Sequence, residues 1–180
     1  RSAHLRGCPQ ELTNCVDSAE REYLPRGITE ALASLDFIDS GLNVCILGPS
    51  DSGKSYLAKA IGIVACNNYK VEYHHCESLL EALVALKVQV YSKYQKRLKR
   101  LCGAALLILD DFLLHTITDE REVKILFEIL EKRCEINLST IICSQREPAS
   151  WSSMILNDEV SANAILKRAT KHYTVVIKPR

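Results

Sequence analysis

The chain has 180 residues, of which 47% are hydrophobic and 25% charged, and its formal net charge is +1 at pH 7. This composition supplies one sizeable core, and the length is too short for two full domains. Its apolar runs are too short to span a membrane and no apolar signal segment follows Arg1, so we expect one compact domain from a longer cytoplasmic protein without a membrane partner.

The first 27 residues form a polar segment, which two prolines and two glycines interrupt. Prolines and glycines are the strongest breakers of regular structure. We therefore predict residues 1–27 to be an approach segment, the remnant of an N-terminal region, outside the main sheet. The core is predicted over residues 28–180, and it begins with an amphipathic stretch at residues 28–37.

A glycine-rich motif separates an apolar strand, predicted at residues 43–47, from an amphipathic helix predicted at residues 54–66. Its sequence, GPSDSGKS, fits the phosphate-binding pattern GxxxxGK[ST] in the strand-to-helix context that the pattern requires. In such a loop the backbone N–H groups and the helix dipole surround the phosphates, Lys54 neutralises the β/γ charge and the Ser55 hydroxyl ligates Mg²⁺. We therefore predict ATP and Mg²⁺ as cofactors. The residues expected to contact the nucleotide are Gly48, Pro49, Ser50, Asp51, Ser52, Gly53, Lys54, Ser55 and Tyr56.

Asp51 is unusual in a loop of this kind. A carboxylate beside a polyphosphate costs electrostatic energy unless it faces solvent or a cation. Aspartate does tolerate the left-handed backbone conformation that such loops use. Weak nucleotide affinity is therefore an alternative that the sequence leaves open.

The next predicted strand, at residues 71–75, runs into the tract His74-His75-Cys76. Alternate residues of a strand share a face, so His74 and Cys76 are the pair that could hold a metal ion. Two ligands make a weak site, and we interpret them as ordinary structural residues. The chain has eight cysteines, which are scattered singly without a CxxC pair, so we expect reduced thiols rather than a disulfide framework.

Helices are predicted at residues 77–86 and 87–101, and the second carries local positive charge without an acidic residue. Its basic side chains suit contacts to DNA phosphates, and Tyr91 and Tyr94 suit stacking on bases or packing on sugars. A solvated amphipathic helix is the alternative, and one helix can be both. The residues that we expect to contact DNA are Lys93, Lys96, Arg97, Lys99 and Arg100.

An unbroken apolar run at residues 104–109 predicts a parallel strand that is covered on both faces. It ends in Asp110 and Asp111, which suits a Walker B site, where a strand end aims carboxylates at the nucleotide. We expect Asp110 to hold Mg²⁺ directly or through water, and Asp111 to act as the general base on the attacking water.

The remaining elements alternate in the same way. A helix capped by Asp119 is followed by a strand at residues 139–143, a helix at 161–170 and a strand at 173–177. Ser144 and Gln145 follow one of these strands and are candidates to contact the γ-phosphate or the water. Repeated strand–helix alternation predicts an α/β fold, a three-layer sandwich with a parallel sheet.

The last predicted helix carries Arg168, far from the glycine-rich loop in sequence. An arginine in this place can serve a neighbouring subunit's nucleotide as an arginine finger. The alternative is a solvated helix charge. We keep Arg168 with Lys54, Asp111, Ser144 and Gln145 as the candidate catalytic residues.

With these residues in place, the chain resembles the IstB/DnaC-like branch of the AAA+ ATPases over about residues 13–178. The matching stretches are GPSDSGKSYLAKAIG, LLILDDF, STIICSQREPASW and ANAILKRATKHYTVVIK, and the last two look most like the IstB helpers of insertion-sequence transposition. The resemblance implies a P-loop NTPase fold of AAA+ type without a C-terminal helical lid, ATP-dependent assembly on DNA, and a transposase as partner. It also implies that Ser144 or Gln145 is a sensor and that Arg168 is a finger acting in trans.

Two function hypotheses follow. The first is a slow ATPase, stimulated by DNA or by homo-oligomer formation, that assists a transposase or, as its relative, loads a replicative helicase. The second is a nucleotide-dependent binding module with little turnover, which Asp51 and the short Asp111 side chain keep open. A small-molecule kinase is a distant third because no arginine-rich lid follows the last predicted strand.

Overall fold

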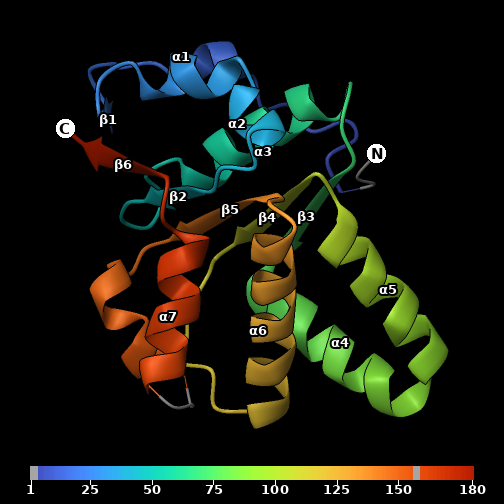
Figure 1. The fold of residues 1–180 in the computed structure, drawn as a ribbon. Coiled ribbons are helices and arrows are strands. Elements are labelled where there is room, and N and C mark those ends of the chain that lie inside the picture. The colour runs from blue at the N-terminus through green and yellow to red at the C-terminus, as the bar shows by residue number, and fades with distance from the viewer. Residues whose placement is uncertain (1–3, 156–158) are drawn as a thin grey trace.

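The computed structural model describes residues 4–155 and 159–180. One sheet of six strands, in the order β1-β6-β2-β5-β4-β3, forms the middle layer (Figure 1). The strands are β1 (Arg21–Leu24), β2 (Val44–Leu47), β3 (Val71–His75), β4 (Leu106–Asp110), β5 (Ser139–Ser144) and β6 (Tyr173–Pro179). The helices are α1 (Ile28–Ala33), α2 (Asp36–Asp39), α3 (Lys54–Ala65), α4 (Cys76–Gln89), α5 (Tyr91–Gly103), α6 (Glu120–Glu135) and α7 (Glu159–Ala169), with short 3₁₀ turns η1 (Leu12–Asn14), η2 (Pro148–Ser150) and η3 (Ser152–Met154).

Helices cover both faces of the sheet, with α1, α2 and α3 on one side and α4 to α7 on the other (Figure 1). Strands β6, β2, β5, β4 and β3 pair in parallel. Side chains alternate along each strand, so Val44 and Ile46 of β2 belong to one core cluster while Cys45 and Leu47 belong to the other. The predicted three-layer α/β sandwich with a parallel P-loop sheet is confirmed.

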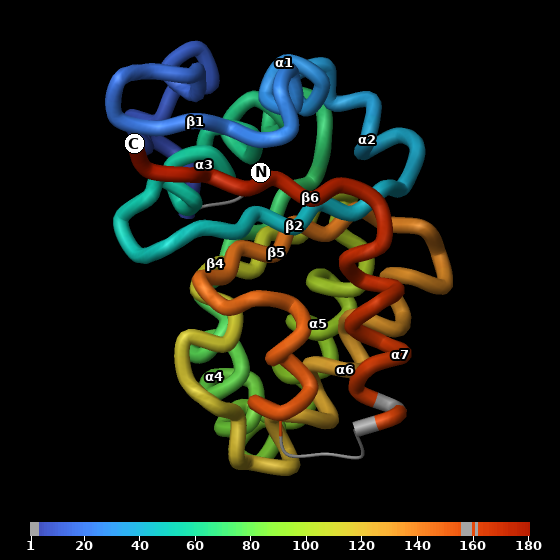
Figure 2. The backbone as a smooth tube through the Cα atoms, turned by 90° about the vertical axis from the view of Figure 1, so that its left-hand side faces the viewer, coloured from blue at the N-terminus to red at the C-terminus, as the bar shows by residue number. Residues whose placement is uncertain are grey.

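The structure corrects one expectation about the first 27 residues, which were predicted to lie outside the main sheet. Strand β1 pairs antiparallel with β6, with Arg21 opposite Pro179 and Tyr23 opposite Ile177. Figure 2 shows β1, β6 and β2 running side by side. Four residues are too few for a periodic signal, and the strand forms here because β6 presents a free edge to it. That residues 1–27 are a remnant of a larger N-terminal region stays a prediction.

Two helix boundaries also differ from the sequence pattern. The stretch at residues 28–37 divides into α1 and α2, because Leu35 has a left-handed backbone with φ of 62°. Helices α4 and α5 meet at Val90 (φ −142°, ψ 83°) rather than after residue 86. Hydrophobic periodicity continues through both breaks, so it did not locate them.

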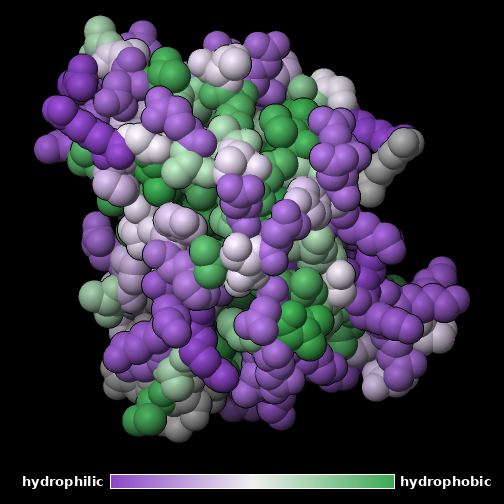
Figure 3. Space-filling view, turned by 45° about the horizontal axis from the view of Figure 1, so that its top comes forward, coloured by the Kyte–Doolittle hydropathy of each residue, from purple (hydrophilic) through white to green (hydrophobic). Residues whose placement is uncertain are grey.

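The eight cysteines are free thiols, as predicted. Burial raises the pKa of Cys45 and of Cys76 to about 12, so these thiols stay protonated and act as small apolar side chains. Hydrophilic side chains cover most of the face over α1 to α3, with smaller hydrophobic patches among them (Figure 3). Among the helices in the described residues, none combines the length and apolar character that crossing a bilayer requires.

Candidate nucleotide-binding site

The glycine-rich loop joins β2 to α3, and both flanking glycines are needed for its shape. Gly53 precedes α3 with φ of 100°, a conformation that side chains other than glycine rarely adopt. A Cβ on Gly48 would lie 2.6 Å from Ser52 Oγ and 2.8 Å from Ile177 O. Among the described residues no side chain caps the start of α3, so its first N–H groups remain available to an anion.

A cavity of about 470 Å³ lies over this loop. Its lining residues come from β1, the glycine-rich loop, the start of α3 and the segments after β4 and β5. They are Arg21, Ser50, Asp51, Gly53, Lys54, Ser55, Tyr56, Asp111, Phe112, Leu114 and Gln145. The structure therefore brings together most of the residues that the sequence assigned to the nucleotide and its hydrolysis. Those that it leaves outside the lining are Gly48, Pro49, Ser52, Asp110, Ser144 and Arg168.

Lys54 is 9% exposed, and its Nζ donates a hydrogen bond to the backbone oxygen of Pro49 at 2.6 Å. Burial lowers the pKa of Lys54, and nearby Cys143, Asp110, Asp111 and Asp51 oppose that shift. A polyphosphate in the cavity would oppose it further, because an anion favours the charged ammonium.

Asp51 in the loop and Tyr56 at the start of α3 also line the cavity. Asp51 is exposed and has φ of 62°, the left-handed conformation anticipated for it. Tyr56, at the start of α3, accepts hydrogen bonds through its hydroxyl oxygen from the Asn14 side chain at 2.9 Å and from the Glu11 N–H at 3.2 Å. The N-terminal segment is thus attached to the edge of the cavity.

Asp110 is fully buried at the end of β4. One carboxylate oxygen accepts a hydrogen bond from the Tyr73 hydroxyl, and the other accepts one from the Asp111 N–H at 2.9 Å. Burial, followed by this bond to Asp110, raises the pKa of Tyr73 well above its ordinary value. Both oxygens of Asp110 therefore already have protein donors.

Asp111 lines the cavity with a left-handed backbone (φ 52°) and a side chain that is 45% exposed. Its Oδ2 lies 3.0 Å from Nδ1 of His75, the last residue of β3. Tyr73 and His75 were not predicted as partners of the two aspartates. The available signal was the adjacency of β3 and β4, whose pairing sets His75 opposite Asp110.

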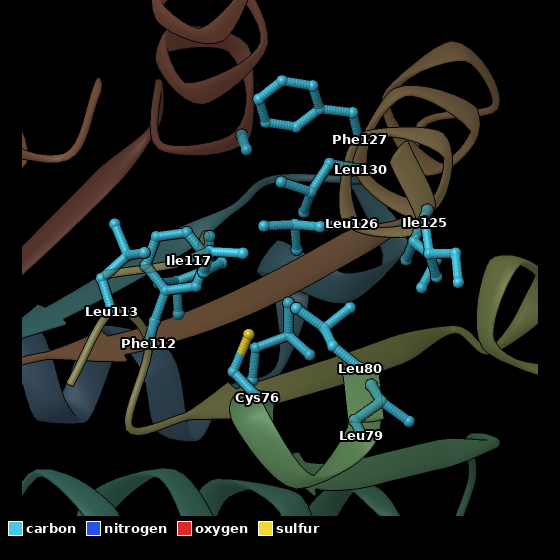
Figure 4. Packing of buried hydrophobic residues seen from close by; sticks show 14 of the residues in the cluster. Cys76, Leu79, Leu80, Phe112, Leu113, Ile117, Ile125, Leu126, Phe127 and Leu130 are labelled. Atoms are coloured by element: carbon cyan, nitrogen blue, oxygen red, sulfur yellow. The ribbon is translucent and has the colours of Figure 1, made fainter. Parts of the chain in front are cut away.

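Ser144 and Gln145 have different surroundings. Ser144 is fully buried, its hydroxyl donates to the backbone oxygen of Phe112 at 2.8 Å, and it accepts from the Arg146 N–H at 3.0 Å. The hydrogen bond to Phe112 holds the segment that follows β4 in place. Phe112, Leu113 and Ile117 of this segment pack into the core (Figure 4). Gln145 is exposed and lines the cavity, so of the two it is the residue placed for contact with a ligand.

Arg168 lies near the C-terminal end of α7, away from the cavity lining. Its Nη2 is 3.5 Å from Glu131 Oε1 of α6, and its side chain is half exposed. Its backbone oxygen accepts from Asn43 Nδ2, next to the start of β2, whereas the glycine-rich loop follows the end of β2. In this chain Arg168 therefore belongs to the opposite end of the sheet, and a role as finger would require a second subunit.

The basic residues of α5 divide into two groups. Lys93, Lys96 and Lys99 are exposed, whereas Arg97 is half-buried and Arg100 forms a 2.6 Å ion pair through Nε with Glu72. The expectation that Tyr94 stacks on bases is wrong, because Tyr94 is only 3% exposed. Tyr91 remains 55% exposed.

The structure also bears on the pair His74 and Cys76. His74 is buried with its Nε2 2.9 Å from Glu72 Oε2, while Cys76 is the first residue of α4 rather than part of the strand. No group of three or more His, Cys, Asp or Glu side chains within residues 4–155 and 159–180 is arranged to hold a metal ion.

The chain matches the model of a known protein family, described as IstB-like ATP binding protein, over residues 4–178. A relative from Bacillus thuringiensis subsp. berliner, named as an ATP-binding protein of insertion sequence IS232, is 35% identical over 165 residues, covering 89% of this chain and 64% of the relative. A second, an insertion-sequence ATP-binding protein of Sinorhizobium fredii, is 37% identical over 166 residues, covering 92% of this chain and 63% of the relative. The chain thus spans less than two thirds of the length of these relatives.

Solved structures show the same fold at lower identity. The DnaC helicase loader superposes with a TM-score of 0.74 at 17% identity, over 94% of this chain and 97% of that one. AMPPCP-bound DnaA from Aquifex aeolicus superposes with a TM-score of 0.73 at 22% identity, over 94% of this chain and 49% of that one.

Proposed function

The chain belongs to the IstB-like ATP-binding protein family of AAA+ P-loop proteins, and from this premise we propose that it hydrolyses ATP slowly in the cavity over the glycine-rich loop. One observation carries the proposal. The available N–H groups at the start of α3, the ammonium of Lys54 and the carboxylate of Asp111 all face one cavity. A phosphate-binding end and a candidate base are what ATP hydrolysis needs together.

We assign Mg²⁺ to Ser55 and Asp110. Ser55 lines the cavity beside Lys54, as the hydroxyl ligand of a P-loop does. The two oxygens of Asp110 already accept hydrogen bonds from Tyr73 and Asp111, so Asp110 fits a role through water better than direct ligation. When bound, the ion would supply positive charge against the β- and γ-phosphates.

In this proposal each side chain has a separate task. Lys54 balances the phosphate charge, Gln145 orients the attacking water, and Asp111 accepts its proton. Ser144 contributes by holding the segment after β4 rather than by touching the phosphate. Lys54 is held by the backbone oxygen of Pro49, and Asp111 is held by His75. Both Lys54 and Asp111 would therefore exchange these partners for the nucleotide or water when ATP binds.

We place the activity in transposition, as a cytoplasmic, DNA-associated helper of a transposase that assembles into a homo-oligomer with ATP. The names of the relatives support this context, because they describe ATP-binding proteins of insertion sequences. The exposed lysines of α5 supply a DNA surface, and Arg168 would complete a neighbour's site. A helicase loader has the same fold, but likeness at 17% identity supports the fold alone.

A nucleotide-dependent binding module with little turnover is the second candidate. It is favoured by Asp111, which pairs with His75 at 3.0 Å instead of pointing freely toward a water, and by Asp51 in the loop. Steady-state phosphate release, measured with and without duplex DNA, separates the two candidates. Release above background that depends on Lys54 supports an ATPase, whereas ATP binding without release would leave the binding module.

A further inference from the structure

We propose that Arg21, on β1, is a second cation for the nucleotide polyphosphate and acts within its own chain. The inference rests on the proposed function and adds a residue to the same site. Arg21 lies 27 residues before the glycine-rich loop begins and has no place in that loop's motif, so only the fold brings it there. If Arg21 contacts the nucleotide, nucleotide affinity also depends on the pairing of β1 with β6.

The position of the guanidinium carries the proposal. Arg21 lines the cavity together with Lys54 and Asp111, and its side chain is 32% exposed. Its Nη1 lies against the turn of the loop, where a Cβ on Gly53 would be 2.5 Å away. A guanidinium at this turn stands beside the N–H groups that would bind phosphate, and its planar fork of donors matches phosphate oxygens.

The charges of the cavity favour the same assignment. Its lining contains two carboxylates, Asp51 and Asp111, and Lys54 is the one cation that the glycine-rich loop contributes. Without Arg21 the lining would be net negative, which opposes binding of a polyanion. Arg21 brings the charge of the lining to zero. Its ion pair with Glu20 is 3.9 Å long and Glu20 is 83% exposed, so this pair is too weak to compete with a phosphate.

Strand β1 is held in place from two sides. Its backbone pairs with β6, and the segment before it reaches Tyr56, which also lines the cavity, through Glu11 and Asn14. A nucleotide that binds Arg21 would therefore stabilise β1 on the sheet, because a ligand stabilises the conformation that binds it. This links the N-terminal segment to nucleotide occupancy.

The test compares dissociation constants for MgATP and MgADP in the full chain. The variants are Arg21→Gln, which keeps a polar side chain of some length over Gly53 but removes the charge, Arg21→Lys and Arg21→Ala. Arg6→Ala is the matched control, because Arg6 is an exposed arginine of the same N-terminal segment outside the cavity lining. We expect Arg21→Gln and Arg21→Ala to bind both nucleotides about tenfold or more weakly, Arg21→Lys to lose less, and the control to match the parent.

Two outcomes would overturn the inference. If Arg21→Gln binds like the parent while Arg21→Ala does not, Arg21 only packs on the loop; if all three variants bind like the control, it has no part in binding. Lys54→Ala is measured alongside, because unchanged binding in that variant would refute the proposed function itself. Hydrogen exchange of the β1 amides gives an independent readout: MgATP should slow exchange in the parent and fail to do so in Arg21→Gln at equal occupancy.

Discussion

The Tyr73 hydroxyl on β3 donates a hydrogen bond to the buried carboxylate of Asp110, at the end of the neighbouring strand β4. Together with the Asp111 N–H, this bond accounts for both oxygens of a carboxylate that solvent does not reach. A buried charge without donors is costly. Tyr73 therefore supplies a donor inside the sheet to the carboxylate that we propose to hold Mg²⁺ through water.

Replacing Tyr73 by Phe should lower the free energy of unfolding by about 1–3 kcal/mol, because Asp110 would lose one buried donor. The effect should depend on pH. Burial and the bond to Asp110 raise the pKa of Tyr73 in the folded chain, so its contribution is complete below the unfolded value near 10 and declines as the pH rises above it.

Urea unfolding of parent and Tyr73→Phe at pH 8 and at about pH 10.5 measures both effects. The difference between the two proteins should shrink at the higher pH. Tyr91→Phe is the matched control, since Tyr91 is 55% exposed and should show little change at either pH. A constant difference across this range would mean that Tyr73 does not act through its proton.

Replacing Asp111 by Asn should leave MgATP affinity near the parent value and slow phosphate release about a hundredfold or more, because an amide cannot accept the proton of the attacking water. Asp111→Glu keeps the carboxylate on a side chain that is longer by one methylene group, and we expect this variant to retain turnover. Equilibrium titration and single-turnover hydrolysis measure the two steps separately. Parent-like turnover in Asp111→Asn would assign the base to another residue.

Replacing Lys93, Lys96 and Lys99 together by Ala should weaken DNA binding and reduce its dependence on salt. Each phosphate contact contributes about 0.9 to the slope of log K against log salt concentration, so three lost contacts should lower the slope by about 2.7. The triple variant omits Arg97 and Arg100, which are half-buried and paired with Glu72 respectively.

The control removes the same charge from exposed lysines elsewhere, at Lys124, Lys171 and Lys178. Fluorescence anisotropy on labelled duplex DNA at several salt concentrations gives both slopes. If the control loses as much of the slope as the α5 variant, binding follows net charge rather than this helix.

If Arg168 is the proposed finger, replacing it by Ala should spare MgATP binding to the isolated subunit and remove any gain in turnover on assembly, because the arginine would then act on a second subunit. Mixing Arg168→Ala with Lys54→Ala is the decisive measurement. The first subunit binds ATP while the second donates the arginine, so some interfaces regain a complete site. Hydrolysis no greater than the sum of the two separate preparations, in mixtures shown to co-assemble, would reduce Arg168 to a surface charge paired with Glu131.

The sequence by itself predicted the sheet layers and the two nucleotide motifs. The loop at residues 48–55 and the Asp110–Asp111 pair are local patterns, because a phosphate loop and a strand end are each made by consecutive residues. Strands at residues 43–47 and 71–75 were predicted within one residue of their observed bounds for the same reason. The neighbouring glycines and the left-handed Asp51 also follow from local backbone geometry.

Tertiary structure alone decided which residues from distant parts of the chain join these motifs. Arg21 reaches the cavity because β1 adds to β6, and Tyr73 and His75 meet the two aspartates because β3 lies next to β4. Ser144 was a candidate, with Gln145, for contact with the γ-phosphate or the water, yet its hydroxyl donates to the backbone oxygen of Phe112. Strand order and strand pairing are made by contacts between residues far apart in sequence, whose partners no local periodicity specifies.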